Sequence, residues 1–232
     1  MRHDIDPQQI SLFYPLQNRG LFERERERER ERVKRFRHSY NNIISTENLL
    51  AAWQEFLRGK RQRKDVIKFS LHFNDNLLAL RQDLVQKTYI HGSYYAFKIN
   101  DPKPRNIHKA TVRDRLVHHA LYRLLHPFYN AKFIHDSYSC RDEKGIHRAI
   151  NRLRSFANQV SRNHTRTCWI LKGDIRQFFA SIDHAILKNI FARYIVDLDI
   201  LWLLGQVIDS FETKDRPGVG LPLGNVTSQI FS

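Results

Sequence analysis

The spacing of the hydrophobic residues constrains the fold of this chain most, because it changes between a helical period and short extended runs. Three- and four-residue spacings predict six helices, in residues 45–57, 66–84, 111–127, 146–160, 183–191 and 200–211. The alternation of Tyr95, Phe97 and Ile99 predicts a strand, and the apolar run of residues 168–171 predicts a buried one. Helices and strands do not alternate regularly, so the pattern predicts an α+β fold rather than a doubly wound sheet.

Short polar motifs predict where several of these elements begin and end. Ser45 and Asp183 are typical helix N-caps, and Thr111 with Asp114 has the form of a capping box. Proline lacks an amide donor, so Pro127 is expected to end the helix that Thr111 begins. The turn at residues 101–105 is expected to join the first predicted strand to a second short one.

The net charge of the 232-residue chain is +15, from 39 lysines and arginines against 24 aspartates and glutamates. Residues 23–32 alternate glutamate and arginine, and neither they nor residues 1–22 carry a net charge, so the surplus belongs to residues 33–232. The repeat is a low-complexity lead-in, either a solvated linker or a binding arm, and the first folded element is expected near Ser45. A surplus this large predicts a polyanionic partner, most simply nucleic acid.

Composition also excludes several classes of protein. Hydrophobic residues make up 41% of the chain, which excludes a disordered protein. Cys140 and Cys168 form neither a disulfide framework nor a CxxC zinc motif, and the adjacent His118 and His119 cannot both face one metal ion. No apolar run approaches the roughly 18 residues of a membrane span, and residues 1–20 lack the apolar core of a signal peptide. A soluble, cytoplasmic protein without a membrane partner is therefore expected.

Residues 173–184 form the segment that most clearly suggests chemistry. Asp174 follows the predicted buried strand, where a carboxylate is costly unless it is paired or holds a cation. Carboxylate oxygens suit Mg²⁺, and Phe178 and Phe179 would wall a pocket beside the acid. A structural interpretation is equally open, in which Asp174 caps the next turn and the two phenylalanines belong to the core.

Two further segments suggest contacts with a phosphate-bearing ligand. Residues 220–229 contain two glycines and a proline near their start, and glycine allows a backbone to approach a ligand closely. Residues 98–123 hold seven basic and two acidic residues, placed at turns and at a helix start where phosphate contacts form readily. The alternative for this second segment is a solvated positive face. A separate run of six basic residues and one acid lies in residues 58–68.

Together these segments resemble the bacterial reverse transcriptases of group II introns, retrons and diversity-generating retroelements. Residues 174–184 are similar to motif A of that family, and residues 220–229 are similar to motif B. The fingers motifs that precede motif A resemble residues 103–105, 113–121 and 136–141. The order and spacing of these segments agree from about Ser45 to Ser232.

The resemblance implies a right-hand polymerase with fingers in residues 45–165 and a partial palm in residues 166–232, after the lead-in of residues 1–44. Motif C of the family, an aromatic-x-Asp-Asp turn, has no match because the chain contains no Asp-Asp pair. The thumb is absent as well, so the 232-residue chain is expected to be a fragment. It is expected to bind RNA with a strong salt dependence but not to extend a primer alone.

The same resemblance implies a role for each candidate site residue in RNA-directed DNA synthesis by two-metal catalysis. Asp174, helped by the Ile175 carbonyl, would be the catalytic residue that binds Mg²⁺. The deoxynucleotide would contact a second group of residues: Lys103 and Arg105 at the triphosphate, Phe179 as the gate against a ribose 2′-hydroxyl, and Leu223 and Gly224 at the nascent base pair. The template would be positioned by Arg113, Arg115 and Arg141.

Motif B also suggests a branch of the family. Leu223-Gly224 and Ser228-Gln229 replace the Gln-Gly and Ser-Pro pairs that most of the family carries. This departure is similar to the diversity-generating retroelement enzymes, which copy template adenines inaccurately. The implied partners are an RNA template, a DNA primer and a small basic accessory protein. Two alternatives stay open: a group II intron or retron enzyme, and a non-catalytic RNA-binding remnant that kept the fingers.

Overall fold

The computed structural model describes residues 35–100 and 104–231, and polar caps begin three of its helices where the sequence predicts them. The Ser45 side chain accepts a hydrogen bond from the Asn48 amide, and the Thr111 side chain accepts one from the Asp114 amide. The Asp183 side chain does the same for the Ile186 amide. These caps satisfy amide groups that have no partner inside the helix, and they confirm the predicted starts.

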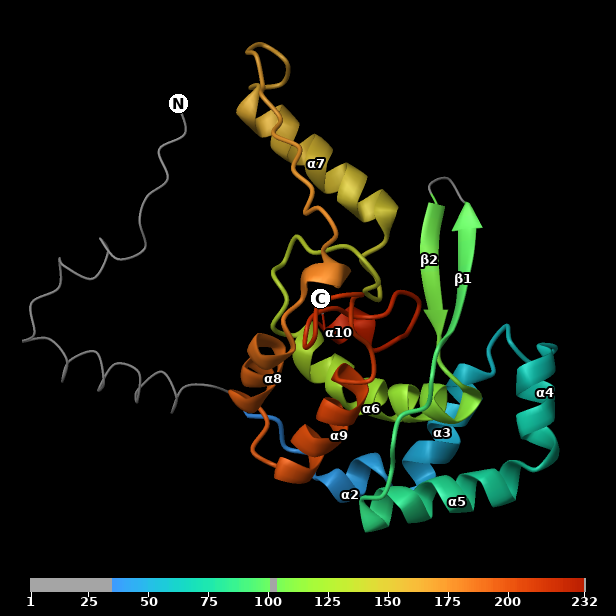
Figure 1. Ribbon diagram of the computed structural model, residues 1–232. Coiled ribbons are helices and arrows are strands. Elements are labelled where there is room, and N and C mark those ends of the chain that lie inside the picture. Colours follow the sequence, from blue (N-terminus) through green and yellow to red (C-terminus); the bar gives the residue numbers. More distant parts are fainter. Residues whose placement is uncertain (1–34, 101–103, 232) are drawn as a thin grey trace, which may run out of the picture. The chain divides into compact units, whose positions relative to one another are not determined.

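The described elements can be followed along the chain in Figure 1. They are α2 (Tyr40–Ile43), α3 (Thr46–Phe56), α4 (Lys64–Leu71), α5 (Phe73–Gln86), β1 (Tyr95–Asn100), β2 (Pro104–Lys109), α6 (Val112–Asn130), α7 (Ile146–Val160), the short 3₁₀ helix η3 (Phe179–Ser181), α8 (His184–Ala192), α9 (Leu198–Ile208) and α10 (Ser228–Phe231). Helices together with one small sheet confirm the α+β class. The division into fingers and palm stays a prediction.

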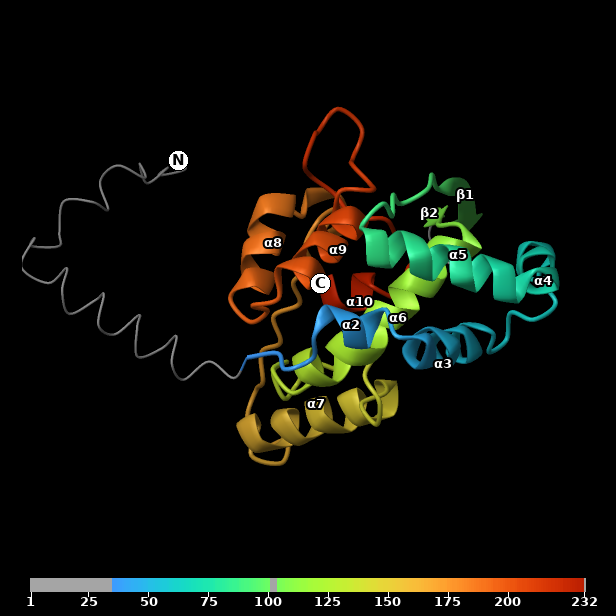
Figure 2. The same ribbon diagram turned by 90° about the horizontal axis from the view of Figure 1, so that it is seen from below.

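Helix α6 lies at the centre of the core, and its neighbours α3, α2, α4 and α10 pack against it (Figures 1 and 2). Leu116, Leu121 and Leu125 on α6 are fully buried, as are Leu49 and Phe56 on α3. Helices α8 and α9 pack on each other. Burying a leucine or phenylalanine side chain contributes roughly 1.5–3 kcal/mol, so the α3–α6 contact is a main source of stability.

The two strands form an antiparallel hairpin that leads directly into α6. Tyr95 pairs with Lys109 and Asn100 pairs with Pro104, while Phe97 lies opposite Ile107. The predicted turn at residues 101–103 lies outside the described residues. The alternation that predicted the first strand is confirmed, although Tyr95, Phe97 and Ile99 are all exposed.

Two predictions about helix length are wrong. Residues 66–84 do not form one helix, because the backbone leaves the helical region at His72 (φ −122°, ψ 38°) and separates α4 from α5. Pro127 does not end α6, which continues to Asn130. A proline removes one helical hydrogen bond, but the buried ring of Tyr129 packs edge-on against Phe191 and keeps the last turn in the core.

The folded part begins earlier than Ser45, so the expectation of a lead-in through residue 44 is too long. Phe36, Tyr40 and Ile43 are buried, and α2 precedes Ser45. The Phe36 amide donates a hydrogen bond to the Tyr194 carbonyl (2.9 Å). This bond joins the start of the folded part to a residue far along the chain. A four-residue helix is too short to show a hydrophobic period, so the pattern could not reveal it.

The predicted buried strand at residues 168–171 is also wrong. The segment has no strand partner among the described residues, and the exposed fractions of Trp169 and Leu171 are 91% and 97%. Helix α7 has the predicted bounds, yet none of its residues is buried. In Figure 1 it lies apart from the other helices, at the top of the view. No helix within residues 35–100 and 104–231 is long and apolar enough to cross a membrane.

Candidate nucleic-acid interface

The glycine-rich loop of residues 220–229 closes against the hairpin, although more than a hundred residues separate them. The His108 amide donates to the Leu223 carbonyl (3.1 Å), and Asn225 Nδ2 donates to the His108 carbonyl (3.2 Å). Gly224 has φ +104°, and a Cβ atom there would lie 2.9 Å from Ile107 Cγ2. The close approach therefore requires glycine. Leu223 and Gly224 thus lie directly on β2.

The same loop is joined to the segment that resembles motif A. The Leu221 amide donates to the Phe179 carbonyl, and the Gly220 amide donates to the Ile182 carbonyl, both at 2.8 Å. Phe179 is half-buried and, like Ile182, packs against the core. Three segments that the sequence singled out, the hairpin, residues 179–182 and the loop, are therefore held together by backbone hydrogen bonds.

Asp174 and Ile175 do not join this arrangement. Both are exposed, in an extended stretch that forms no strand. No group of three or more histidine, cysteine, aspartate or glutamate side chains in the described part of the chain could hold a metal ion. Mg²⁺ is usually held by one or two carboxylates together with substrate phosphates, so Mg²⁺ binding by Asp174 stays a prediction. Asp183 serves as a helix cap, the structural role that the sequence suggested for it.

Three of the predicted basic residues have partners inside the protein. Arg113 pairs with Asp83 and lies over the Tyr89 ring, 5.0 Å from its centroid. Arg115 pairs with Asp65 and lies over the Phe56 ring (4.9 Å). Arg141 donates to the Asn130 side chain and to the carbonyls of residues 130, 134 and 137. Arg141 thus holds its own loop together. Arg105 is exposed on β2, and Lys103 lies outside the described residues.

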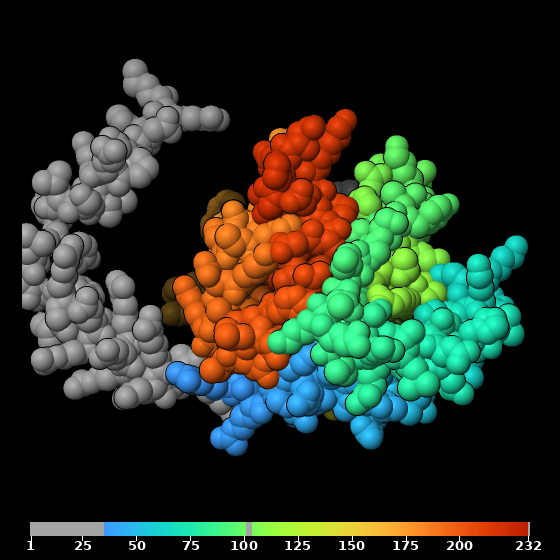
Figure 3. Space-filling model, turned by 60° about the horizontal axis from the view of Figure 1, so that its bottom comes forward, coloured from blue at the N-terminus to red at the C-terminus, as the bar shows by residue number. Residues whose placement is uncertain are grey.

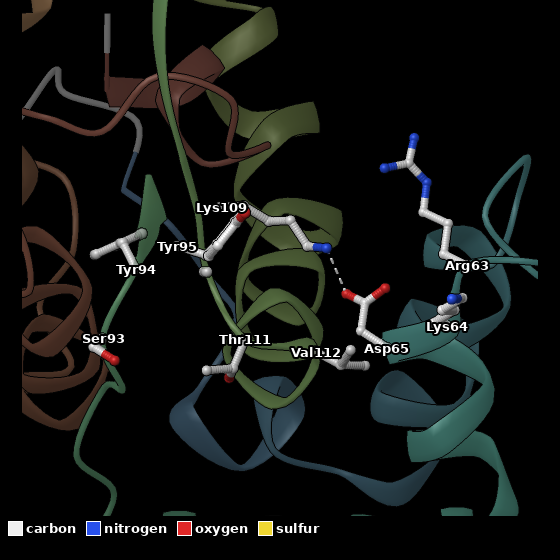
Figure 4. A pocket seen from close by; sticks show the side chains of 10 residues that line it. Arg63, Lys64, Asp65, Ser93, Tyr94, Tyr95, Lys109, Thr111 and Val112 are labelled. Carbon is white, nitrogen blue, oxygen red and sulfur yellow. Dashed lines mark ion pairs between the residues drawn. The ribbon is translucent and has the colours of Figure 1, made fainter. Parts of the chain in front are cut away.

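Two basic cavities lie beside the hairpin. The larger, of about 970 Å³, lies between the start of α4 and the hairpin, and Lys109 crosses it to pair with Asp65 at 2.8 Å (Figure 4). The smaller, of about 560 Å³, is bounded by the hairpin, α6 and the glycine-rich loop. Arg63 and Lys109 line both. Figure 3 shows the yellow-green surface of α6 between the green segment that leads into the hairpin and the blue-green α4 and α5.

The sequence analysis missed two residues of this surface, Lys60 and Arg63. Both line the smaller cavity, and neither forms an ion pair with any residue from 35–100 or 104–231. The signal that could have revealed them is the basic run of residues 58–68. That run lacked a recognisable motif, so only the fold shows that it faces the hairpin.

The basic side chains shift the pKa values of their neighbours. Burial, together with Lys60 and Arg115, lowers the pKa of His119 to about 4. Burial and the nearby Arg115 and Arg63 lower the pKa of Lys60. Burial opposes ionisation of Asp65, but hydrogen bonds from Lys109 and Arg115 lower its pKa. Positive charges crowded in this way favour an anionic ligand, because it relieves their mutual repulsion.

Comparison with known proteins gives relatives that are longer than this chain. No protein-family model matches it. A stretch of 166 residues is 25% identical to Protein YkfC of Escherichia coli (strain K12) and covers 67% of this chain and 43% of that protein. A stretch of 92 residues is 28% identical to Nuclear intron maturase 1, mitochondrial, of Arabidopsis thaliana, covering 40% of this chain and 12% of the maturase.

Among solved structures, the chain is similar to part of a Partial Cas6-RT-Cas1–Cas2 complex. The TM-score is 0.48 at 20% sequence identity, with 83% of this chain and 32% of that chain covered. The matched region spans less than half of each of these three proteins. By sequence, part of this chain is therefore similar to part of an intron maturase.

Proposed function

We propose that this chain binds single-stranded RNA as the fingers and partial palm of a reverse transcriptase-like polymerase. The observation that carries the proposal is the junction of three segments predicted to share one site. The hairpin, the end of the segment similar to motif A and the loop similar to motif B meet through backbone hydrogen bonds beside a basic surface. The maturase similarity and the net charge of +15 support the same function.

In this proposal each candidate site residue that the structure describes has a role that fits its position. Arg105 is exposed on β2 and is available to a triphosphate, while Leu223 and Gly224 lie on the hairpin where a nascent base pair would be bounded. Phe179 would exclude a ribose 2′-hydroxyl. Arg115 lines the smaller cavity and would position the template. Arg113 and Arg141 would support the fold around the template through their internal contacts.

The polymerase chemistry and the branch of the family are finer proposals. Asp174 would be one carboxylate ligand of Mg²⁺, a cation that prefers carboxylate oxygens and substrate phosphates. The Leu223-Gly224 pair favours the diversity-generating retroelement branch. The maturase similarity favours the intron alternative. Primer extension by this chain that is lost in Asp174→Asn would assign polymerase chemistry to it and would overturn the expectation that the chain does not extend a primer alone.

RNA binding by the whole 232-residue chain tests the proposal. We expect the logarithm of the binding constant for a single-stranded RNA to fall with log salt by about 0.7 for each contacted phosphate. In a parallel assay with dATP, whose triphosphate Arg105 is proposed to contact, Arg105→Gln is expected to weaken binding. The matched control is Arg154→Gln on α7, an exposed arginine away from the hairpin. Equal effects of the two substitutions would contradict the proposal, because they would show binding by net charge alone.

A further inference from the structure

We propose that the smaller cavity is a subsite for one nucleotide of a single nucleic-acid strand, with its phosphate at Lys60 and Arg63. The subsite rests on the proposed function, because the nucleotide belongs to the RNA strand that the chain is proposed to bind. None of the basic residues that the resemblance implied is needed for this phosphate contact. The site follows instead from the charge, the shape and the apolar wall of the cavity.

The charge of the cavity is one-sided. Four basic side chains line it, and no acidic side chain among the described residues does so: Lys60, Arg63, Lys109 and Arg115. Asp65, which lines the larger cavity, pairs with both Lys109 and Arg115, so its single charge offsets one of their two positive charges. Lys60 has no carboxylate partner in the described ranges, and in Figure 4 the guanidinium of Arg63 extends away from Asp65. The four basic side chains and Asp65 together leave a net charge of +3, and Lys60 and Arg63 are the two without a carboxylate partner among the described residues.

The ring of Phe56 contacts two of the basic side chains, Lys60 and Arg115. Lys60 Nζ lies 4.9 Å from the ring centroid, and Arg115 Cζ also lies 4.9 Å from it. The ring is fully buried, and a cation over the face of an aromatic ring is attracted to it. Lys60 is therefore positioned at the cavity before any ligand arrives, which lowers the entropy cost of binding.

The apolar part of the lining comes mainly from the hairpin and the loop. Phe97 and Ile107 are cross-strand partners and line the cavity together with Val226. Phe97 is only partly covered, with 37% of its surface exposed. A charged side and an aromatic side suit one nucleotide unit, because bases stack on aromatic rings while basic residues follow the backbone. The cavity volume of about 560 Å³ lies within the range of small-ligand sites.

Substitutions on the two sides of the cavity test the subsite with the intact chain. The probes are a single-stranded RNA octamer and, separately, dATP, and binding is followed as a function of salt. Lys60→Gln is expected to weaken RNA binding five- to ten-fold and to reduce the salt slope by about 0.7. Phe97→Ala is expected to weaken it at least five-fold with an unchanged slope, because stacking releases no counterions.

Lys68→Gln is the matched control for charge, since Lys68 is exposed on α4 and lines neither cavity. We expect less than a two-fold change in its RNA affinity. Normal binding by the unsubstituted chain with equal losses in Lys60→Gln and Lys68→Gln would overturn the subsite alone. Failure of the unsubstituted chain to bind RNA would overturn the proposed function as well. A Lys60→Gln effect on dATP but not on RNA would overturn the assignment to a strand.

Discussion

Replacing Asp114 by alanine is expected to lower the free energy of unfolding by about 3–5 kcal/mol, because this carboxylate is buried and fully engaged. Only 1% of its surface is exposed. It accepts hydrogen bonds from the Tyr89 hydroxyl (2.8 Å), the Thr111 hydroxyl (2.5 Å) and the Gly92 amide (3.2 Å). The substitution would leave the Tyr89 hydroxyl buried without this partner and would remove the acceptor of the half-buried Gly92 amide.

The same carboxylate links the chain before the hairpin to the start of α6. Burial and the Asp114 charge raise the pKa of Tyr89, so its phenol stays protonated and keeps donating. Loss of this link is expected to loosen the hairpin and therefore to weaken RNA binding as well as stability. Urea unfolding followed by circular dichroism measures the first effect.

Asp75→Ala is the control for Asp114→Ala. Asp75 also lies in the first turn of a helix, α5, but its side chain is exposed. Its loss removes only a favourable interaction with the helix dipole, worth about 0.3–1 kcal/mol. A loss below 1 kcal/mol in Asp114→Ala, similar to that in Asp75→Ala, would contradict the account of a buried polar link.

Gly220→Ala is expected to cost about 3 kcal/mol or more, from backbone strain and a steric clash together. Gly220 has φ +116°, and an added Cβ would lie 2.2 Å from Thr213 Oγ1 and 2.9 Å from the Thr213 amide nitrogen. The Gly220 amide donates to the Ile182 carbonyl, and its own carbonyl accepts from His184 Nε2 at 2.7 Å. The substitution would therefore separate the loop from residues 179–184.

Gly218→Ala distinguishes strain from clash. Gly218 also has a positive φ, +69°, but an added Cβ there would meet nothing within 4 Å. Its cost is expected to be about 1–2 kcal/mol, the penalty of a left-handed conformation alone. Thermal unfolding of both variants makes the comparison. Equal losses of stability in the two variants would show that Thr213 moves aside for the added Cβ. The loop would then not be fixed at Gly220.

Local signals in the sequence predicted where several helices begin and end. They did not predict which faces of these elements are buried. Thr111 and Asp183 marked helix starts because a cap depends on a few neighbouring residues. The bounds of α7 followed from its hydrophobic period, yet its apolar face is exposed. Period reveals that a face is apolar but not what covers it. The apolar run at residues 168–171 failed as a buried strand for the same reason, since no described strand pairs with it.

The same difference between local patterns and tertiary contacts applies to the candidate site. Motif spacing indicated the hairpin and the glycine-rich loop, and the structure brings them together at Ile107 and Gly224. Lys60 and Arg63 were missed because their role depends on the turn that places the basic run opposite β2. Arg141 was assigned to the template from its motif, but its donors are used by the loop of residues 130–137, a contact that no spacing reveals.

Photo-crosslinking of a short RNA that contains 4-thiouridine, followed by peptide mapping, locates the RNA on the surface of this chain. The account predicts crosslinks in the linker and hairpin beside the smaller cavity, residues 56–63, 95–100 and 104–109, and in the loop of residues 220–229. It also predicts that these crosslinks weaken together in Lys60→Gln. Crosslinks confined to α7 and residues 168–175, with none on the hairpin, would contradict it.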